Sequence, residues 1–212
     1  MAIATWTGRS RDPAVVSADI ARALTAELRL PAPPPAQVLA GDSEGVPAGS
    51  LLPPRERFSG MPALTECFVY VDARAPRPFE LRASVLTGRA IRRSFGLGLL
   101  QYAVPLTVPV PGPVALGERR HGRPSAFEGD PETARRLGAD SELLTLADHV
   151  SATVAGPDST HQWKVDRFLT VQPQTAGGLL LARTLHRQTA GGWTLGAEAV
   201  LALAARIENA LI

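Results

Sequence analysis

A run of 24 residues without a charged side chain, from Ser94 to Gly117, restricts the fold more than any other feature of the sequence. Its length and apolar character would suit a helix that crosses a membrane. Its second half, however, contains Pro105, Pro109, Pro111 and Pro113. Prolines at this spacing remove successive helical hydrogen bonds, and lipid offers the freed backbone groups no partner. We therefore expect buried strand and turn in this run, and no membrane span.

The composition favours a mixed fold over a helical bundle. The 212 residues are 45% hydrophobic, enough for a sizeable core, and the 19 glycines and 19 prolines indicate many turns. We expect an α+β fold, a mainly antiparallel sheet covered by helices, in one body or in two similar-sized lobes, with a closing C-terminal helix. The expected parts are an N-terminal helix packing on the core within 1–30, a proline-rich linker or covering loop at 31–60, and an α+β domain at 61–212.

Helices are expected where a capping residue precedes an apolar stripe. Asp12 followed by Pro13 is typical of a helix start, and the apolar stripe behind it continues until Pro31. The same device at Asp130 and Pro131 predicts a short helix to residue 137. Further helices are predicted behind two more caps, Ser141 and Thr194, the last with a stripe formed by Val200, Leu203, Ala204, Ile207 and Leu211.

Strands are expected where β-branched and aromatic residues run together or alternate with polar ones. In 79–86 the alternation predicts that Phe79, Leu81, Ala83 and Val85 form the buried face. Residues 89–100 combine a helical apolar spacing with two glycines, and a short helix or turn is expected there. The expected strands are 67–71, 79–86, 102–110, 114–116, 168–171 and 179–182.

The sequence lacks the spacings on which common active sites depend. Its four histidines, His121, His149, His161 and His186, are isolated from one another, so none forms a metal-binding pair. A Gly-x-Ser-x-Gly elbow, a Walker loop and a Gly-x-Gly-x-x-Gly loop are also missing. We expect no catalytic residue, no metal and no cofactor, and the enzyme question stays open with a preference for a non-enzyme.

The cysteine content and the first residues predict a compartment. Cys67 is the only cysteine, so the chain cannot form an intrachain disulfide. The opening MAIATWTGRSRDPAVV lacks the basic segment, apolar run and cleavage site of a signal peptide. We expect a cytoplasmic protein.

Residues 173–180 read PQTAGGLL, which resembles the PQTSGGLL segment of the selenide, water dikinases. The likeness covers eight positions only, in a chain that lacks the glycine-rich, cysteine-bearing N-terminal stretch and the acidic metal ligands of those enzymes. A glycine-containing hairpin requires the same residue types for conformational reasons. A hairpin is the interpretation adopted here.

A broader likeness runs from residue 114 to residue 212. An apolar strand, a charged loop, the motif Phe-x-Gly-Asp-Pro-x-x-Ala-x-x-Leu, a Leu-rich helix, two strands and a closing helix resemble a family of uncharacterised bacterial α+β proteins. This resemblance implies the fold and no activity. The matching residues are Phe127, Gly129, Asp130, Pro131, Ala134, Leu137, Leu143 and Leu144.

The leading functional hypothesis is a non-catalytic interaction or accessory subunit of a cytoplasmic assembly, with a protein partner or further copies of the chain. The proline-rich segment and the apolar residues of 95–113 motivate it. The residues expected on the interaction surface are Leu97, Leu99, Leu100 and Tyr102.

Two alternatives depend on arginine, which supplies nearly all of the positive charge because Lys164 is the only lysine. The first is a small-molecule enzyme or ligand-binding protein whose guanidinium groups hold an anion. The second is peripheral nucleic-acid binding, with Trp6, Trp163 or Tyr102 as stacking platforms; the formal charge of only +2 makes it unfavourable. The candidate anion-binding residues are Arg89, Arg92, Arg93, Arg119, Arg120 and Arg123.

Overall fold

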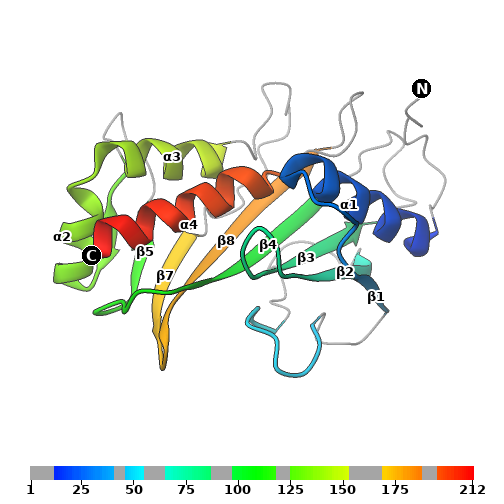
Figure 1. The fold of residues 1–212 in the computed structure, drawn as a ribbon, viewed down its shortest axis with the longest axis horizontal. Coiled ribbons are helices and arrows are strands. Elements are labelled where there is room, and N and C mark those ends of the chain that lie inside the picture. The colour runs from blue at the N-terminus through cyan, green and yellow to red at the C-terminus, as the bar shows by residue number, and fades with distance from the viewer. Residues whose placement is uncertain are drawn as a thin grey trace. The chain divides into compact units, whose positions relative to one another are not determined.

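The computed structural model describes residues 12–40, 46–54, 65–86, 97–117, 125–152, 169–187 and 195–212. In chain order the helices and strands are α1 (Pro13–Leu28), β1 (Ala36–Ala40), β2 (Thr65–Ala73), β3 (Phe79–Leu86), β4 (Leu97–Leu106), β5 (Val114–Leu116), β6 (Phe127–Gly129), α2 (Pro131–Gly138), α3 (Ser141–Ala152), β7 (Leu169–Gln174), β8 (Gly177–Arg187) and α4 (Ala197–Leu211). Figure 1 shows their course.

The strands form an eight-stranded antiparallel sheet in the order β1-β2-β3-β4-β8-β7-β5-β6. The chain divides into two compact units, each described by itself below. Unit 1 comprises residues 1–101 and 185–195, and unit 2 comprises residues 102–184 and 196–212. The α+β class, the antiparallel sheet and the C-terminal helix are therefore as predicted from the sequence.

Unit 1 is a sheet region with one described helix. The Asp12 carboxylate accepts a hydrogen bond from the backbone N–H of Ala14, which starts α1, and Arg29 ends it in the left-handed conformation at φ 52°. Helix α1 packs on β1 and β2 (Figure 1). Its buried positions repeat at helical spacing and are Val16, Ser17, Ile20, Ala21 and Leu24.

Unit 2 carries the other three helices. Asp130 accepts hydrogen bonds from the backbone N–H and the hydroxyl of Thr133 and so caps α2, as its sequence predicts. Helices α2, α3 and α4 pack on one another, and α2 packs on β6. The inward side of α4 is fully apolar and is formed by Ala197, Val200, Leu201, Leu203, Ala204, Ile207 and Leu211.

The β7–β8 hairpin in unit 2 requires a glycine at position 177 for conformational reasons. Thr175 and Ala176 form the turn, and Gly177 follows at φ 121°, which side chains rarely adopt. A Cβ atom at Gly177 would also collide with the carbonyl oxygen of Leu106. The hairpin interpretation of the PQTAGGLL segment is therefore confirmed.

Several predicted elements differ in the structure. Residues 36–40 form β1 inside the segment expected to be a linker or covering loop, because hydrogen bonding to β2 overrides the flanking prolines. Strand β4 covers 97–106, so its first residues are strand rather than helix or turn, and it ends before the predicted 102–110. Strand β6 was not predicted, since its residues Phe127, Glu128 and Gly129 include a single apolar side chain.

The caps of two helices also differ from the prediction. Asp140, not Ser141, accepts hydrogen bonds from the backbone N–H groups of Glu142 and Leu143 at the start of α3. Helix α4 follows Gly196, which offers no side-chain cap, and Thr194 lies outside the described residues. Within the part of the chain that the structure describes, no helix is long and apolar enough to cross a membrane.

Candidate interaction site along strand β1

The register of β1, β2 and β3 sorts their side chains onto two faces that differ in chemistry. Gln37 lies opposite Tyr70, which lies opposite Arg82, and these three residues share one face. The cross-strand pair of Asp72 and Glu80 belongs to the same face, because both are two residues away along their strands. We call this the polar face of unit 1.

The opposite face of these strands is apolar and lies against α1. The residues in register there are Ala36 opposite Val71 and Val38 opposite Val69. The valines of β2 are fully buried, as is Leu81 of β3. Helix α1 covers this face (Figure 1), and the ordinary hydrophobic effect is sufficient to hold it there.

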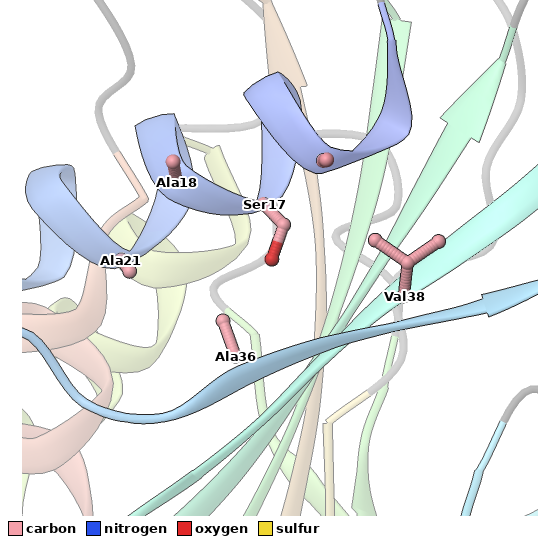
Figure 2. Close-up of a pocket in the computed structure, with 6 residues that line it drawn as sticks. Ser17, Ala18, Ala21, Ala36 and Val38 are labelled. Atoms are coloured by element: carbon pink, nitrogen blue, oxygen red, sulfur yellow. The ribbon is translucent and has the colours of Figure 1, made fainter.

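A groove of about 380 Å³ remains between α1 and β1 because the side chains facing each other are small. In Figure 2 Ser17 of the helix and Ala36 and Val38 of the strand point into the space between the two elements. Two of its lining residues, Ala14 and Ala18, are exposed. Its lining residues are Ala14, Ser17, Ala18, Ala21, Ala36 and Val38.

A second groove of about 440 Å³ lies on the polar face of the same strand. One wall comes from Pro35, Ala36 and Gln37, at the start of β1 and just before it. The segment 47–50 forms another wall, and the floor is formed by Tyr70, Asp72, Arg74 and Glu80. Strand β1 therefore has an open groove on each side, one apolar and one polar.

Glu80 organises the polar groove from below. Its Oε2 atom accepts hydrogen bonds from the Ser50 hydroxyl at 2.5 Å, from the Leu51 N–H at 2.9 Å and from the Leu52 N–H at 3.4 Å. A buried carboxylate is costly unless it is hydrogen-bonded in this way. Glu80 thus fixes the segment 46–54 against the sheet and shapes the groove wall.

Tyr70 contributes an uncharged hydroxyl to the same groove. Burial raises its pKa to about 12, and the negative charge of Glu80 acts in the same direction. The phenol therefore stays protonated at neutral pH and can both donate and accept a hydrogen bond. Tyr70 is suited to recognition of a polar group and not to proton abstraction.

Asp72 and Arg74 form the rim of the polar groove. Arg74 Nη2 and Asp72 Oδ2 are 2.5 Å apart, and the exposed fractions of the two side chains are 77% and 37%. Asp72 also faces Glu80 directly across the strands, where two like charges repel. Two carboxylates and one guanidinium consequently line this groove.

Deeper in the polar face, Arg82 is only 1% exposed. Its Nε atom donates to Oε1 of Gln101 at 2.7 Å, and its guanidinium lies 5.7 Å from the centre of the Phe68 ring. Buried arginines are rare and require such partners. The polar face therefore continues into the core of unit 1, although its alternating sequence predicts exposure.

The outer edge of β1 is the third component of the site. Strand β1 ends the sheet order, and among the described residues no strand pairs with its outer side. A sheet edge presents backbone N–H and C=O groups that can pair with a strand from another chain. The edge and the two grooves together form what we call the β1 site.

The β1 site was not found from the sequence. Its weak signal in the sequence is the apolar pair Val38-Leu39, which follows the proline run within the segment expected to be a linker or covering loop. The polar face was missed because Glu80, Arg82 and Ser84 alternate with apolar residues, a pattern typical of a half-exposed strand. All three are buried in the structure.

The residues predicted to form an interaction surface lie elsewhere. Leu100 and Tyr102 are each 1% exposed and are buried in β4, so a strand takes them into the core rather than to the surface. Leu97 and Leu99 belong to the same strand, but their side chains are outside the described part of the structure. Only the backbone of these last two residues is placed.

The predicted anion-binding arginines Arg89, Arg92, Arg93, Arg119, Arg120 and Arg123 all lie outside the described residues. So do Trp6 and Trp163, the proposed stacking platforms. Across the described ranges, no three side chains of histidine, cysteine, aspartate or glutamate come together in a way that could hold a metal ion. Cys67 is buried in β2.

Comparison with known proteins adds no relative, since no family model, no curated protein and no solved structure matches the chain.

Proposed function

We propose that the protein is a non-catalytic interaction subunit and that it binds a protein partner at the β1 site. The observation that carries this proposal is the position of β1, a short edge strand with an open groove on each face. A partner strand added to this edge would gain backbone hydrogen bonds, and the side chains on one of its faces would lie next to the groove beside α1. The binding mode needs no catalytic group.

The chemistry of the grooves supports recognition over turnover. Both are open to solvent along β1, whereas small-molecule sites enclose most of their ligand. The Glu80 carboxylate already accepts three hydrogen bonds from the segment 50–52, and Tyr70 keeps its proton at neutral pH. These groups hold a surface in shape, which is what a binding site requires.

The proline-rich segment before β1 also supports this role. Pro31, Pro33, Pro34 and Pro35 precede the strand, and proline restricts the chain before any partner arrives. Less conformational entropy is then lost when a partner strand pairs with β1. Edge strands of stable monomers are commonly protected from pairing by a proline or a charge within the strand. The prolines here precede β1, and the strand itself contains neither a proline nor a charged residue.

The proposal is tested by interrupting the outer edge of β1 with proline. Consecutive residues of a strand direct their N–H groups to opposite sides, so of Gln37→Pro and Val38→Pro one disrupts pairing with β2 and the other only the outer edge. Circular dichroism identifies the variant that stays folded. Native mass spectrometry then compares it with the unaltered 22.4 kDa chain purified from the same cells.

We expect the unaltered chain to carry a partner or a second copy and the folded proline variant to lose it. A chain that is monomeric and free of partners in both forms would contradict the proposal. So would a complex that survives the proline at the outer edge unchanged. Glu198→Gln, an exposed change on α4 in unit 2, is the matched control and should leave the complex intact.

A further inference from the structure

We infer that the partner at the β1 site is a second copy of this chain, whose β1 pairs antiparallel with β1 of the first copy. This inference rests on the proposed function and adds the identity of the partner. Two antiparallel edge strands related by a two-fold axis extend the sheet of one copy into the sheet of the other. The axis passes beside Val38, the central residue of the strand Ala36–Ala40.

The absence of charge along the strand favours its own copy as the partner. At a two-fold axis each residue lies close to the same residue of the other copy, so a charged residue there would repel itself. Residues 30–40 contain no charged side chain, and β1 reads AQVLA. An uncharged edge offers a charged partner strand no counter-charge, so it suits another uncharged strand. The strand β1 of a second copy meets this requirement.

The backbone of β1 allows one antiparallel register that pairs the whole strand. Alternate residues of an edge strand direct their N–H and C=O groups outward. In the register centred on Val38, position 36 lies opposite position 40 of the other copy, and position 37 lies opposite position 39. Opposite positions then differ by an even number, so outward groups meet outward groups whichever alternate set β1 presents. All five residues of each strand take part.

The side of β1 that faces α1 has room for this arrangement. Directly opposite residues of an antiparallel pair point to the same face of the sheet, so the Val38 side chains of the two copies lie beside each other on the α1 side. Ala14 and Ala18, which line the groove there, are exposed. The groove of about 380 Å³ therefore receives an aliphatic side chain from the second copy, which removes apolar surface from water.

On the other face of the paired strands, Gln37 of one copy lies opposite Leu39 of the other. Gln37 is exposed and Leu39 is half-buried. The carboxylates of the polar groove, Asp72 and Glu80, belong to strands further inside the sheet and take no part in the pairing. This face is therefore uncharged at the axis in both copies, and charges introduced there should separate them.

Charge substitution at these two positions tests the register in the full chain. Sedimentation velocity of the unaltered 22.4 kDa chain should show a dimer with a Kd below about 100 µM, as expected for a small interface. The double variants Gln37→Glu/Leu39→Glu and Gln37→Lys/Leu39→Lys each place like charges directly opposite each other. Each should weaken the dimer at least about tenfold. Unchanged dimerisation in either variant would overturn the inference.

An equimolar mixture of the two double variants should restore the dimer, because each introduced carboxylate then lies opposite an introduced ammonium group. Damage to the fold of either chain would not be repaired by mixing. If the change at Leu39 unfolds the chain, the exposed Gln37 alone repeats the test as Gln37→Glu and Gln37→Lys, with an effect of about two- to threefold. Thr175→Glu/Ala176→Glu, at an exposed turn in unit 2, is the matched control and should leave the dimer unchanged.

The outcomes separate this inference from the proposed function. If the chain carries a different protein that the folded proline variant of β1 releases, strand addition at the edge stands and self-pairing is wrong. If the chain is a dimer that the proline does not disrupt, or a monomer without any partner, both are wrong. A dimer that the proline disrupts but that mixing the charge variants does not restore leaves the proposed function standing and overturns the pairing centred on Val38.

Discussion

The helices of the two units are held by different means. In unit 2, α2 and α3 begin at the capping carboxylates of Asp130 and Asp140, and Glu208 of α4 accepts hydrogen bonds from the backbone N–H and hydroxyl of Thr107. Arg206 of α4 also pairs with Asp140. In unit 1, Asp12 caps the start of α1, Glu27 accepts a hydrogen bond from the Leu195 N–H, and the helix faces β1 with small side chains that leave a groove.

The difference shows where each unit places its polar groups. Unit 2 places capping carboxylates at the starts of α2 and α3. Unit 1 buries Glu80, Arg82 and Gln101 on one face of its sheet and leaves the adjoining edge strand open. Buried polar groups contribute little net stability but allow only a few arrangements of their neighbours. The two units therefore differ in where their polar side chains lie, and the proposed binding site is in unit 1.

The largest expected effect comes from removing core volume in the two units. Leu143 in α3 and Leu24 in α1 are both fully buried. Each Leu→Ala change should lower the free energy of unfolding by about 2–5 kcal/mol, with Leu143 nearer the upper value because its helix packs on both α2 and α4, which limits collapse of the cavity. Urea unfolding followed by circular dichroism measures both. A larger loss for Leu24→Ala would contradict the comparison.

A smaller loss is expected on the polar face of unit 1. Gln101→Leu removes the oxygen that accepts from Arg82 and leaves a buried guanidinium short of a partner, at a cost of about 1–3 kcal/mol. The same urea experiment reports it. Gln172→Leu on β7 is the matched control, because Gln172 is only partly buried and should change stability by less than about 0.5 kcal/mol.

Tyr70 gives a spectroscopic test of the same face. Its pKa near 12 lies above that of an exposed tyrosine, so the folded state favours the neutral phenol and is destabilised as the pH rises from about 10 to 12. Absorbance at alkaline pH should show a late-ionising tyrosine component that is lost in Tyr70→Phe. The substitution itself should cost only about 0.5–1.5 kcal/mol. Ionisation of this tyrosine near pH 10 would refute its burial.

The smallest effect is expected at the surface of unit 2. The Arg206 guanidinium lowers the pKa of Asp140 to about 2, and the N–H of Leu143 acts in the same direction. The contribution of Asp140 is therefore present above pH 4 and is lost as the pH falls towards 2. Thermal unfolding measured between pH 2 and pH 5 should show that the stability of Asp140→Asn depends less on pH than that of the unaltered chain. An unchanged acid limb would show that the ion pair is not formed in solution.

The sequence predicted what local chemistry determines. The helix starts at Asp12 and Asp130 and the helix α4 could be predicted because a cap or a helical period is recognised from neighbouring residues alone. The strand alternation of 79–86 correctly placed Phe79, Leu81 and Ala83 in the core. The fold class follows from these signals together.

The candidate site could not be predicted in the same way. Strand β1 exists because β2 pairs with residues 36–40, and that partner begins 25 positions later in the chain. Burial of Arg82 depends on Gln101 in β4, and burial of Glu80 depends on Ser50 in a loop. Such contacts are formed between segments far apart in sequence, which periodicity and composition do not record.

The hairpin of β7 and β8 has a consequence for how this gene can vary. Thr175 and Ala176 at its turn are exposed, so a library of all twenty amino acids at these codons should return many functional clones. At codon 177 the φ of 121° and the nearby carbonyl oxygen of Leu106 leave room for hydrogen alone. Deep mutational scanning should therefore show that only glycine is tolerated at position 177, directly beside positions 175 and 176, which tolerate many amino acids.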